Sequence, residues 1–588
     1  MNRIFYALKN NFNSLIKAFS RFPLTALFLA FATFLSWYMV NLHGTPPHYI
    51  EKLAFASVLG AIMSAAAQGL YERFQGPQRI YTFLGTIILT VGYYLIISPV
   101  PEISEEVSLR TFVAIFALLC LFLWIPSYRR VTTFDSITLT HFKSVFTAFL
   151  YAAVLSAGVS AIIGAIDVLL FNINSDIYLY ANETIWIFFM PMYYLSILPK
   201  FSSEEEEDLV YGKKAAIYPK FLDILMSRIA IPIIAIFTGV LIIYFIKILV
   251  TFKWPIGQVG PIVLGYATAG IFIFILSSLL ENNFAKRYRK YFPKFLIGVV
   301  LMQLVSVGIR INAYGITESR YYVALFGIYA LVCGIILSFK STERNGLIVL
   351  LLAGFAIFSV VPPVDTFTVS RVSQISRIEK ILTAEGMLSN GKLLAKENPS
   401  ENSKIEITNI LSYLNSRGYT SRVKWLPKDF NSYNDMKATL GFDSYYKNSV
   451  DNAKNDIYLN LDSNYPIDIS GYDALLTMSS NPYDKGNNAD QDVVIKGQPY
   501  KVKVTKISSL DSSIDVIDAS GKIVISAKLY DEVKKFISMS SYSKEMMPPS
   551  SLSFEKSENG YSMKIILQNA NLSDKDANYT FYVLIKGK

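Results

Sequence analysis

Residues 307–322 place ionisable and hydroxyl side chains between two strongly apolar runs. In chain order these are Arg310, Tyr314, Thr317, Glu318, Arg320 and Tyr321. Ionisable groups at the edge of a membrane are costly and mark functional or structural sites. The forked donors of arginine suit a phosphate or a carboxylate, and the hydroxyl groups add further donors. This stretch therefore fits the binding of an anionic group, such as a phosphate, a carboxylate or a lipid headgroup.

The elements around this stretch are apolar enough to lie in a membrane. Of the 588 residues, 52% are hydrophobic and 17% are charged, a charged fraction below that of soluble proteins. Mean hydropathy is +0.36. Apolar residues dominate as far as about residue 361 and then thin out. We therefore expect a polytopic α-helical membrane domain at residues 23–361 and a soluble α+β domain at residues 364–588.

The membrane domain is expected to contain about eleven spanning helices, because a span needs about 20 apolar residues. The runs of that kind are 23–40, 53–71, 80–97, 109–125, 145–171, 177–198, 229–250, 259–280, 295–311, 321–339 and 347–361. Residues 1–22 carry apolar side chains at helical spacing. This pattern predicts an amphipathic helix on the cytoplasmic leaflet or against the protein itself.

Loop charges predict the orientation. The positive residues of one set of loops are Arg3, Lys9, Lys17, Arg21, Arg73, Arg79, Arg129, Arg130, Lys143, Lys200, Lys213, Lys214, Lys220, Arg228, Lys286, Arg287, Arg289, Lys290, Lys294, Lys340 and Arg344. The alternate loops carry only Lys52, Lys253, Arg310 and Arg320, with Arg110 at a helix end. Positive residues favour the cytoplasmic side, so the N-terminus is expected in the cytoplasm. Eleven spans place the C-terminal domain outside it, and ten or twelve would reverse its side.

This topology predicts a shared depth for six ionisable residues from five helices. They are Asp167, Glu183, Lys247, Arg310, Glu318 and Arg320. One hypothesis is a polar chamber in the outer leaflet that holds an anionic group. The alternative is structural, with these groups paired to each other, capping helix ends or reaching water. Shared depth leaves the choice open, because the rotation of each helix is not visible in the sequence.

Other chemistries find little support. Cys120 and Cys333 lie inside apolar runs and are expected to pack there. His43 and His48 have a spacing that suits a metal, but no third ligand is evident, and His141 is expected to be structural. The chain has no phosphate-binding glycine motif, and no basic face with an aromatic platform for nucleic acid. We therefore expect no metal, no cofactor and no nucleic-acid partner.

The C-terminal domain changes from helical to strand patterns along its length. Helices are expected at 370–385, 400–417, 433–440 and 529–538. Strands are expected at 457–461, 500–505, 523–526, 563–567 and 579–585, and in several of these apolar and polar residues alternate. The domain contains neither histidine nor cysteine, which argues against a histidine-dependent catalytic triad or zinc centre there.

Four stretches resemble a bacterial family of uncharacterised membrane proteins, domain of unknown function 4153. They are Arg310-x-x-x-Tyr-Gly-Ile-Thr-Glu-x-Arg-Tyr321, Ala165-Ile-Asp-Val-Leu-Leu-Phe171, Tyr194-Leu-Ser-Ile-Leu-Pro199 and Val369-Ser-Arg-Val-Ser-Gln-Ile-Ser-Arg-Ile-Glu-Lys-Ile-Leu382. The resemblance covers roughly residues 140–395. It implies a polytopic membrane protein with a C-terminal extension. The family has no assigned activity, so the resemblance identifies no catalytic residue.

We therefore expect an integral membrane protein of a bacterial inner or plasma membrane, with no assigned activity. It would bind, sense or transport an anionic or lipid-linked envelope component at the outer leaflet, with membrane lipids as partners. One alternative is a non-catalytic scaffold or signalling protein whose outer domain binds an envelope protein. Another is a membrane enzyme acting on a lipid-linked substrate, with Asp167 and Glu183 as the carboxylates to test. The absence of a recognisable catalytic pair favours the non-enzymatic interpretations.

Overall fold

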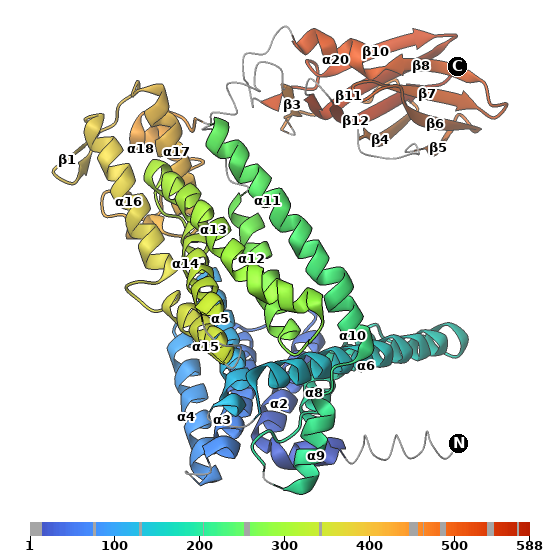
Figure 1. Ribbon diagram of the computed structural model, residues 1–588. Coiled ribbons are helices and arrows are strands. Elements are labelled where there is room, and N and C mark those ends of the chain that lie inside the picture. The colour runs from blue at the N-terminus through green and yellow to red at the C-terminus, as the bar shows by residue number, and fades with distance from the viewer. Residues whose placement is uncertain are drawn as a thin grey trace. The chain divides into compact units, whose positions relative to one another are not determined.

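The chain divides into two compact units, Met1–Arg377 and Ile378–Lys588, which are described separately (Figure 1). The computed structural model describes residues 14–74, 78–128, 132–203, 205–251, 259–339, 344–445, 457–462, 464–481, 490–537, 546–572 and 576–588. The start of the predicted amphipathic helix, residues 1–13, lies outside the described residues. Residues 14–21 of that segment are helical.

The described residues of the first unit form helices and the connections between them. Its helices are α2 (Pro23–Asn41), α3 (His48–Phe74), α4 (Arg79–Ile97), α5 (Glu105–Trp124), α6 (Phe134–Leu169), α7 (Asp176–Glu183), α8 (Met190–Ser196), α9 (Glu206–Ala215), α10 (Lys220–Ile224), α11 (Ile231–Thr251), α12 (Val259–Ser277), α13 (Asn283–Tyr314), α14 (Glu318–Phe339), α15 (Gly346–Phe358) and α16 (Thr366–Ala384), the last of which continues into the second unit. Two π-helical segments, η2 (Thr184–Phe189) and η3 (Leu225–Ala230), interrupt this series.

Within the described residues, nine helices are long and apolar enough to cross a membrane. This confirms the predicted multi-pass α-helical domain. The number eleven stays a prediction, because two of the expected spans do not meet this criterion. The sixth is divided into α7, η2 and α8. The eleventh, α15, is a shorter apolar helix.

Small residues allow the helices to pack closely. A methyl group on Gly60 of α3 would lie within 3.0 Å of both Phe28 of α2 and Thr90 of α4. A methyl group on Gly270 of α12 would lie 2.2 Å from the Phe292 ring of α13. Close backbone approach at small residues is a common source of helix association in membranes. Cys120 and Cys333 belong to the largest buried cluster, as the sequence predicts.

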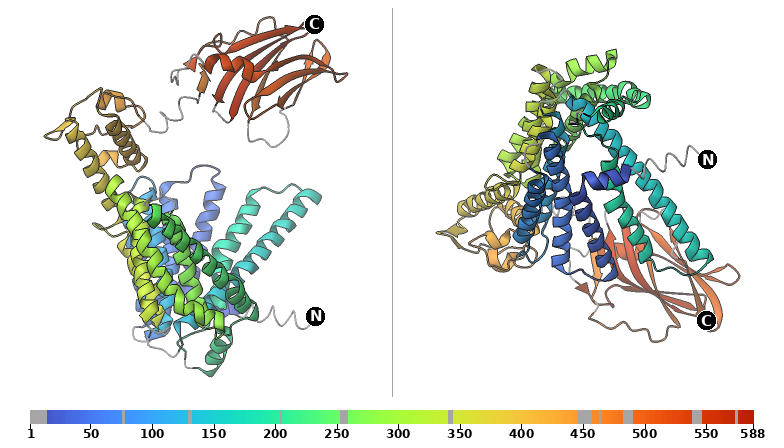
Figure 2. Two further views of the ribbon diagram at one scale, coloured as in Figure 1. Left: turned by 45° about the horizontal axis from the view of Figure 1, so that its top comes forward. Right: turned by 90° about the horizontal axis from the view of Figure 1, so that it is seen from below.

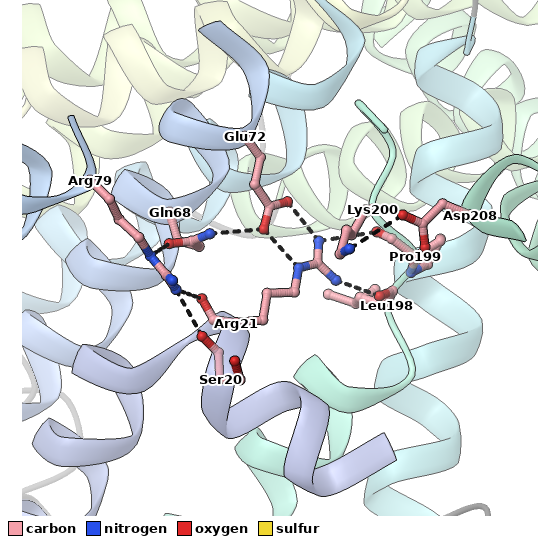
Figure 3. Close-up of polar contacts among 9 residues, drawn as sticks. All are labelled: Ser20, Arg21, Gln68, Glu72, Arg79, Leu198, Pro199, Lys200 and Asp208. Atoms are coloured by element: carbon pink, nitrogen blue, oxygen red, sulfur yellow. Dashed lines mark hydrogen bonds and ion pairs between the residues drawn. The ribbon is translucent and has the colours of Figure 1, made fainter. Parts of the chain in front are cut away.

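One end of the bundle joins the loops that the charge pattern assigns to the cytoplasm (Figure 3). The Arg21 guanidinium donates to both carboxylate oxygens of Glu72 at 2.8 Å, and to the Leu198 carbonyl at 2.6 Å. Arg79 donates to the Ser20 carbonyl at 2.9 Å and to the Arg21 carbonyl at 2.6 Å. These bonds connect the start of α2, the α3–α4 connection and the segment after α8. We call this the first end of the bundle.

Two further connections reach the first end. Arg73 donates to the Tyr128 carbonyl at 2.6 Å, which links the end of α3 to the segment after α5. The Asn345 amide donates to Asp135 at 2.8 Å and to the Ser278 hydroxyl at 3.0 Å. The start of α15 is thereby joined to the start of α6 and the end of α12. All of these positions lie in or beside loops of the predicted cytoplasmic set.

The opposite set of loops lies at the other end of the bundle, which we call the second end. Lys52, at the start of α3, donates to the Ser98 carbonyl after α4 at 3.0 Å. The His43 imidazole lies 2.9 Å from the Asp176 carboxylate, which joins the α2–α3 loop to the start of α7. The connection at 314–318, between α13 and α14, is hydrogen-bonded to α16.

The second unit begins with helices and ends in a β-rich region, as the sequence predicts (Figure 2). Its helices are α17 (Glu401–Ser416), α18 (Met436–Leu440) and α20 (Leu529–Ile537). Its strands are β1 (Leu388–Ser389), β2 (Lys392–Leu393), β3 (Ile457–Leu461), β4 (Ala474–Ser480), β5 (Gln491–Ile495), β6 (Gln498–Lys506), β7 (Ser512–Asp518), β8 (Ile523–Lys528), β9 (Met546–Met547), β10 (Ser553–Glu558), β11 (Tyr561–Leu572) and β12 (Ala577–Lys586).

Two sheets form the β-rich region. One has the order β4-β12-β11-β3-β9, with β10 also paired to β11, and the other has the order β5-β6-β7-β8. Both sheets contribute to one apolar core, which includes Val502, Val504, Phe581 and Val583. These residues occupy alternate positions along β6 and β12, so the alternation seen in the sequence separates a buried face from an exposed one.

Candidate functional site

The α13–α14 connection, which carries the residues singled out above, is fixed to α16. The Ile316 amide donates to the Ser373 hydroxyl at 2.9 Å. The Gln374 side-chain amide donates to the carbonyls of Tyr314 and Ile316 at 3.0 and 2.9 Å. These bonds supply partners for carbonyls at and just after the end of α13, which have no partner within the helix. Much of this polar stretch therefore serves as a docking surface for α16.

Gly315 makes that docking possible. Its backbone has φ 69° and ψ 177°, a combination that is open essentially to glycine alone. A Cβ atom at this position would lie 2.8 Å from Nε2 of Gln374 and 3.3 Å from the Ser373 hydroxyl. The glycine thus provides both the chain reversal after α13 and the close approach of α16.

Arg320 completes the same connection. Its guanidinium donates to the carbonyls of Tyr314 and Gly315 at 3.1 and 2.8 Å, and it lies 5.5 Å from the centre of the Tyr314 ring. Tyr321 donates to the Val364 carbonyl at 2.6 Å, and the Thr317 carbonyl accepts from the Tyr321 amide. These four of the predicted site residues make contacts typical of a structural role. A fifth, Glu318, is buried at the first position of α14.

Arg310 differs from them. It lines a pocket of about 100 Å³ between the start of α12, the end of α13 and the start of α14. Ser306, one turn earlier on the same face of α13, Ser319 and Arg320 also line it. The Nε atom of Arg310 is buried and has no hydrogen-bond partner among the described residues. Burying such a donor without an acceptor costs about 1–3 kcal/mol or more. The pocket therefore presents a cationic donor that lacks an acceptor.

A second polar cluster surrounds the start of α16. Asp365 is fully buried and accepts from the amides of Phe367 and Thr368 at 3.1 Å, as a residue capping a helix start does. The Arg110 guanidinium lies 3.4 Å from Asp365 and 2.6 Å from Glu106. In the sequence, Arg110 is noted only as a charge at a helix end, and Asp365 is not among the predicted site residues.

This cluster contains several buried polar atoms without partners among the described residues. They are Arg110 Nε, Asp365 Oδ2, Thr366 Oγ1 and Ser370 Oγ. Asp365, Thr366 and Ser370 are fully buried. Buried polar groups in native proteins nearly always have a partner, so this concentration points to bound water or a ligand.

The remaining predicted site residues lie elsewhere. Asp167 accepts from the Ile173 amide at 2.6 Å and caps the turn between α6 and α7. Glu183, on α7, contacts Ser36 of α2. Lys247 is exposed on α11. Figure 2 shows the tip of the teal hairpin of α6 and α7 apart from α13 and α14 in both views. A single chamber of six residues is therefore not formed, although each residue keeps its place on the expected helix.

The histidines also have protein partners. The backbone carbonyl of Asn41 and the Asp176 carboxylate raise the pKa of His43 above its ordinary value. His48 lies 3.5 Å from Glu51. His141 is buried, and its Nδ1 atom lies 2.6 Å from the Tyr194 hydroxyl. Across the described residues, no group of three or more histidine, cysteine, aspartate or glutamate side chains has an arrangement suited to a metal ion.

Comparison with known protein families agrees with the resemblance that the sequence motifs of this region indicate. The family model "Domain of unknown function (DUF4153)" matches residues 30–395. The chain belongs to this family. The DUF4153 region contains the Arg310 pocket, the α13–α14 connection and all of α16, whereas most of the second unit lies beyond it.

A curated relative gives no further assignment. An uncharacterised protein of Pasteurella multocida (strain Pm70) is 22% identical over 307 residues. The alignment covers 51% of this chain, and this chain spans about half (50%) of the length of that relative. No solved structure matches the chain. The protein is thus a multi-pass membrane member of the DUF4153 family, and neither comparison indicates a specific activity.

Proposed function

We propose that this protein binds an anionic group of the bacterial envelope in the Arg310 pocket, at the outer surface of the inner or plasma membrane. The Nε atom of Arg310, which has no partner among the described residues, is the observation on which this function rests. A phosphate or carboxylate oxygen in the pocket would accept from it, and the hydroxyl groups of Ser306 and Ser319 line the same space. Charge-assisted bonds of this kind are among the strongest that proteins make.

We further propose eleven membrane crossings, with the first end of the bundle in the cytoplasm and the C-terminal domain outside. The contacts at the two ends support this arrangement, because the connections for which such contacts are described alternate between the first end and the second. The sixth expected span still accounts for one crossing, although it is divided into α7, η2 and α8. Together these segments run from Asp176 at the second end to Leu198 at the first. The positive residues gather in the loops of the first end, as the positive-inside rule requires of the cytoplasmic side.

Binding of inorganic phosphate and of a short-chain anionic phospholipid to the purified full-length protein tests this function. Calorimetry at low ionic strength should show binding by the unmodified protein. Arg310→Gln should weaken the binding about 10- to 100-fold, which corresponds to one lost charged hydrogen bond. Arg310→Lys should lie between the two, because it keeps the charge without the forked donors.

Lys247→Gln is the matched control. It removes one positive charge at a similar predicted depth, from an exposed position outside the pocket. If Arg310→Gln and Lys247→Gln weakened anion binding equally, the loss of one positive charge would explain both effects. That result would contradict a site at Arg310. Full binding by Arg310→Gln would do the same. Preference for the phospholipid over inorganic phosphate would identify a lipid headgroup as the source of the anion.

A further inference from the structure

An apolar groove at the second end reaches Tyr322 and Ser359, which adjoin the polar cluster around Asp365. The groove has a volume of about 190 Å³ and runs between α5, α14 and α15. Its walls are apolar, with Phe116, Leu325, Phe355 and Ala356 among them. Tyr322 and Ser359 are the polar residues at its outer end. α15 packs against both α5 and α14, so it forms the floor of the groove.

Tyr322 connects the two parts. It lines the groove beside Ser359, and its hydroxyl interacts with the Ser359 side chain. The same hydroxyl lies within electrostatic range of Glu318, Asp365 and Arg110. Ser359 provides a second connection, because its carbonyl accepts from the Thr366 amide at 2.9 Å. A molecule whose chain filled the groove would therefore have its polar end beside the Arg110–Asp365 pair.

The buried atoms without partners determine which polar end would fit. Among the described residues, Arg110 Nε is a donor that lacks an acceptor, and Asp365 Oδ2 is an acceptor that lacks a donor. Glu106 and Asp365 already flank the single guanidinium, so a purely anionic group would be repelled by two carboxylates. A headgroup with one anionic and one N–H-bearing cationic part satisfies both atoms. The phosphate would accept from Arg110, and the ammonium group would donate to Asp365.

We propose that this groove binds one chain of a zwitterionic, amine-bearing phospholipid of the phosphatidylethanolamine type, with its headgroup at Arg110, Tyr322 and Asp365. The site is separate from the Arg310 pocket and does not depend on the function proposed for that pocket. Its apolar walls accept a hydrocarbon chain from the surrounding bilayer without exposing that chain to water. Tyr322 would donate to the phosphate or to a glycerol ester oxygen.

Native mass spectrometry of the purified full-length protein tests this site with equal mixtures of phosphatidylethanolamine and phosphatidylcholine of the same chain length. The two headgroups carry the same charges, but the choline nitrogen has no N–H donor. Phosphatidylethanolamine should be retained about tenfold better, in line with one charged hydrogen bond. Equal retention of the two lipids would overturn the proposed headgroup contacts. Stronger retention of phosphatidylglycerol, which is anionic, would overturn them as well.

Two pairs of variants locate the binding. Ala356→Trp fills the groove and should abolish retention, whereas Ile357→Trp, on the exposed side of the same helix, should leave it unchanged. Asp365→Asn should remove the preference between the two lipids and still cap α16, because asparagine caps helices as well as aspartate does. If Asp365→Asn fails to fold, Tyr322→Phe removes the hydroxyl alone and should reduce retention. Unchanged retention in Ala356→Trp and Tyr322→Phe would refute the site.

Discussion

Replacing Gly315 by alanine should release α16 from the α13–α14 connection. The backbone at Gly315 has φ 69° and ψ 177°, a region that costs other residues about 1–3 kcal/mol. The added methyl group would also lie 2.8 Å from Gln374 Nε2, which donates two hydrogen bonds to this connection. Each bond contributes about 1 kcal/mol. Together these effects give a local destabilisation of roughly 2–4 kcal/mol.

Hydrogen–deuterium exchange of the full-length protein measures this effect locally. A cost of about 2 kcal/mol corresponds to about 30-fold faster exchange in peptides covering 312–320 and 368–377, if these segments exchange by local opening. Gly308→Ala is the control, because it lies within α13 and its added methyl group would meet no neighbouring element within 4 Å. Alanine is favoured over glycine in a helix by about 1 kcal/mol, so this variant should exchange no faster than the unmodified protein. Equal exchange in both variants would refute the proposed role of Gly315.

Two further variants probe other contacts. Arg21→Lys keeps the charge but loses the two-pronged contact with Glu72, so it should destabilise the first end by about 1–3 kcal/mol, measured as a lower midpoint of thermal unfolding in detergent. An unchanged midpoint would show that this network adds no stability. In the second unit, hydrogen bonds from Ser400 and Lys396 lower the pKa of Glu385 from 4.5 to about 2. Its contribution to stability is therefore complete above the unfolded pKa and is lost as the pH falls towards the folded one. Circular dichroism should show an acid-induced change in this range that Glu385→Gln reduces, and identical titrations would contradict the assignment.

The sequence predicts helices and strands well where periodicity and length are decisive. The apolar runs correspond to helices, and the alternating stretches at 500–505 and 579–585 correspond to β6 and β12. The division of the sixth expected span by η2 is not visible in the sequence, because residues 184–189 are apolar, as a continuous spanning helix would be, and a π-helical turn leaves no mark in hydropathy.

The candidate site is less predictable for two physical reasons. The depth of a residue in the membrane follows from its position along the helix, but the direction of its side chain depends on how the helices pack. A shared predicted depth therefore does not bring Asp167 and Lys247 close to Arg310. The Arg110–Asp365 pair joins positions 255 residues apart, and no local pattern identifies such a contact. Two signals are nevertheless present. Arg110 stands in a region where positive charge is disfavoured, and Asp365 precedes an amphipathic helix in the position of a capping residue.

Arg310 and Arg320 show why residue type alone leaves function undecided. The predicted topology assigns both to the side of the membrane where positive charge is unexpected, and both line the same pocket. Arg320 donates to the carbonyls of Tyr314 and Gly315, so the end of α13 accounts for its presence. Arg310 lies one turn before the end of α13 and has a buried donor with no acceptor among the described residues. The structural alternative thus accounts for Arg320, whereas the ligand-binding proposal rests on Arg310. A ligand that accepted from Arg310 would bind directly beside the connection on which α16 is docked.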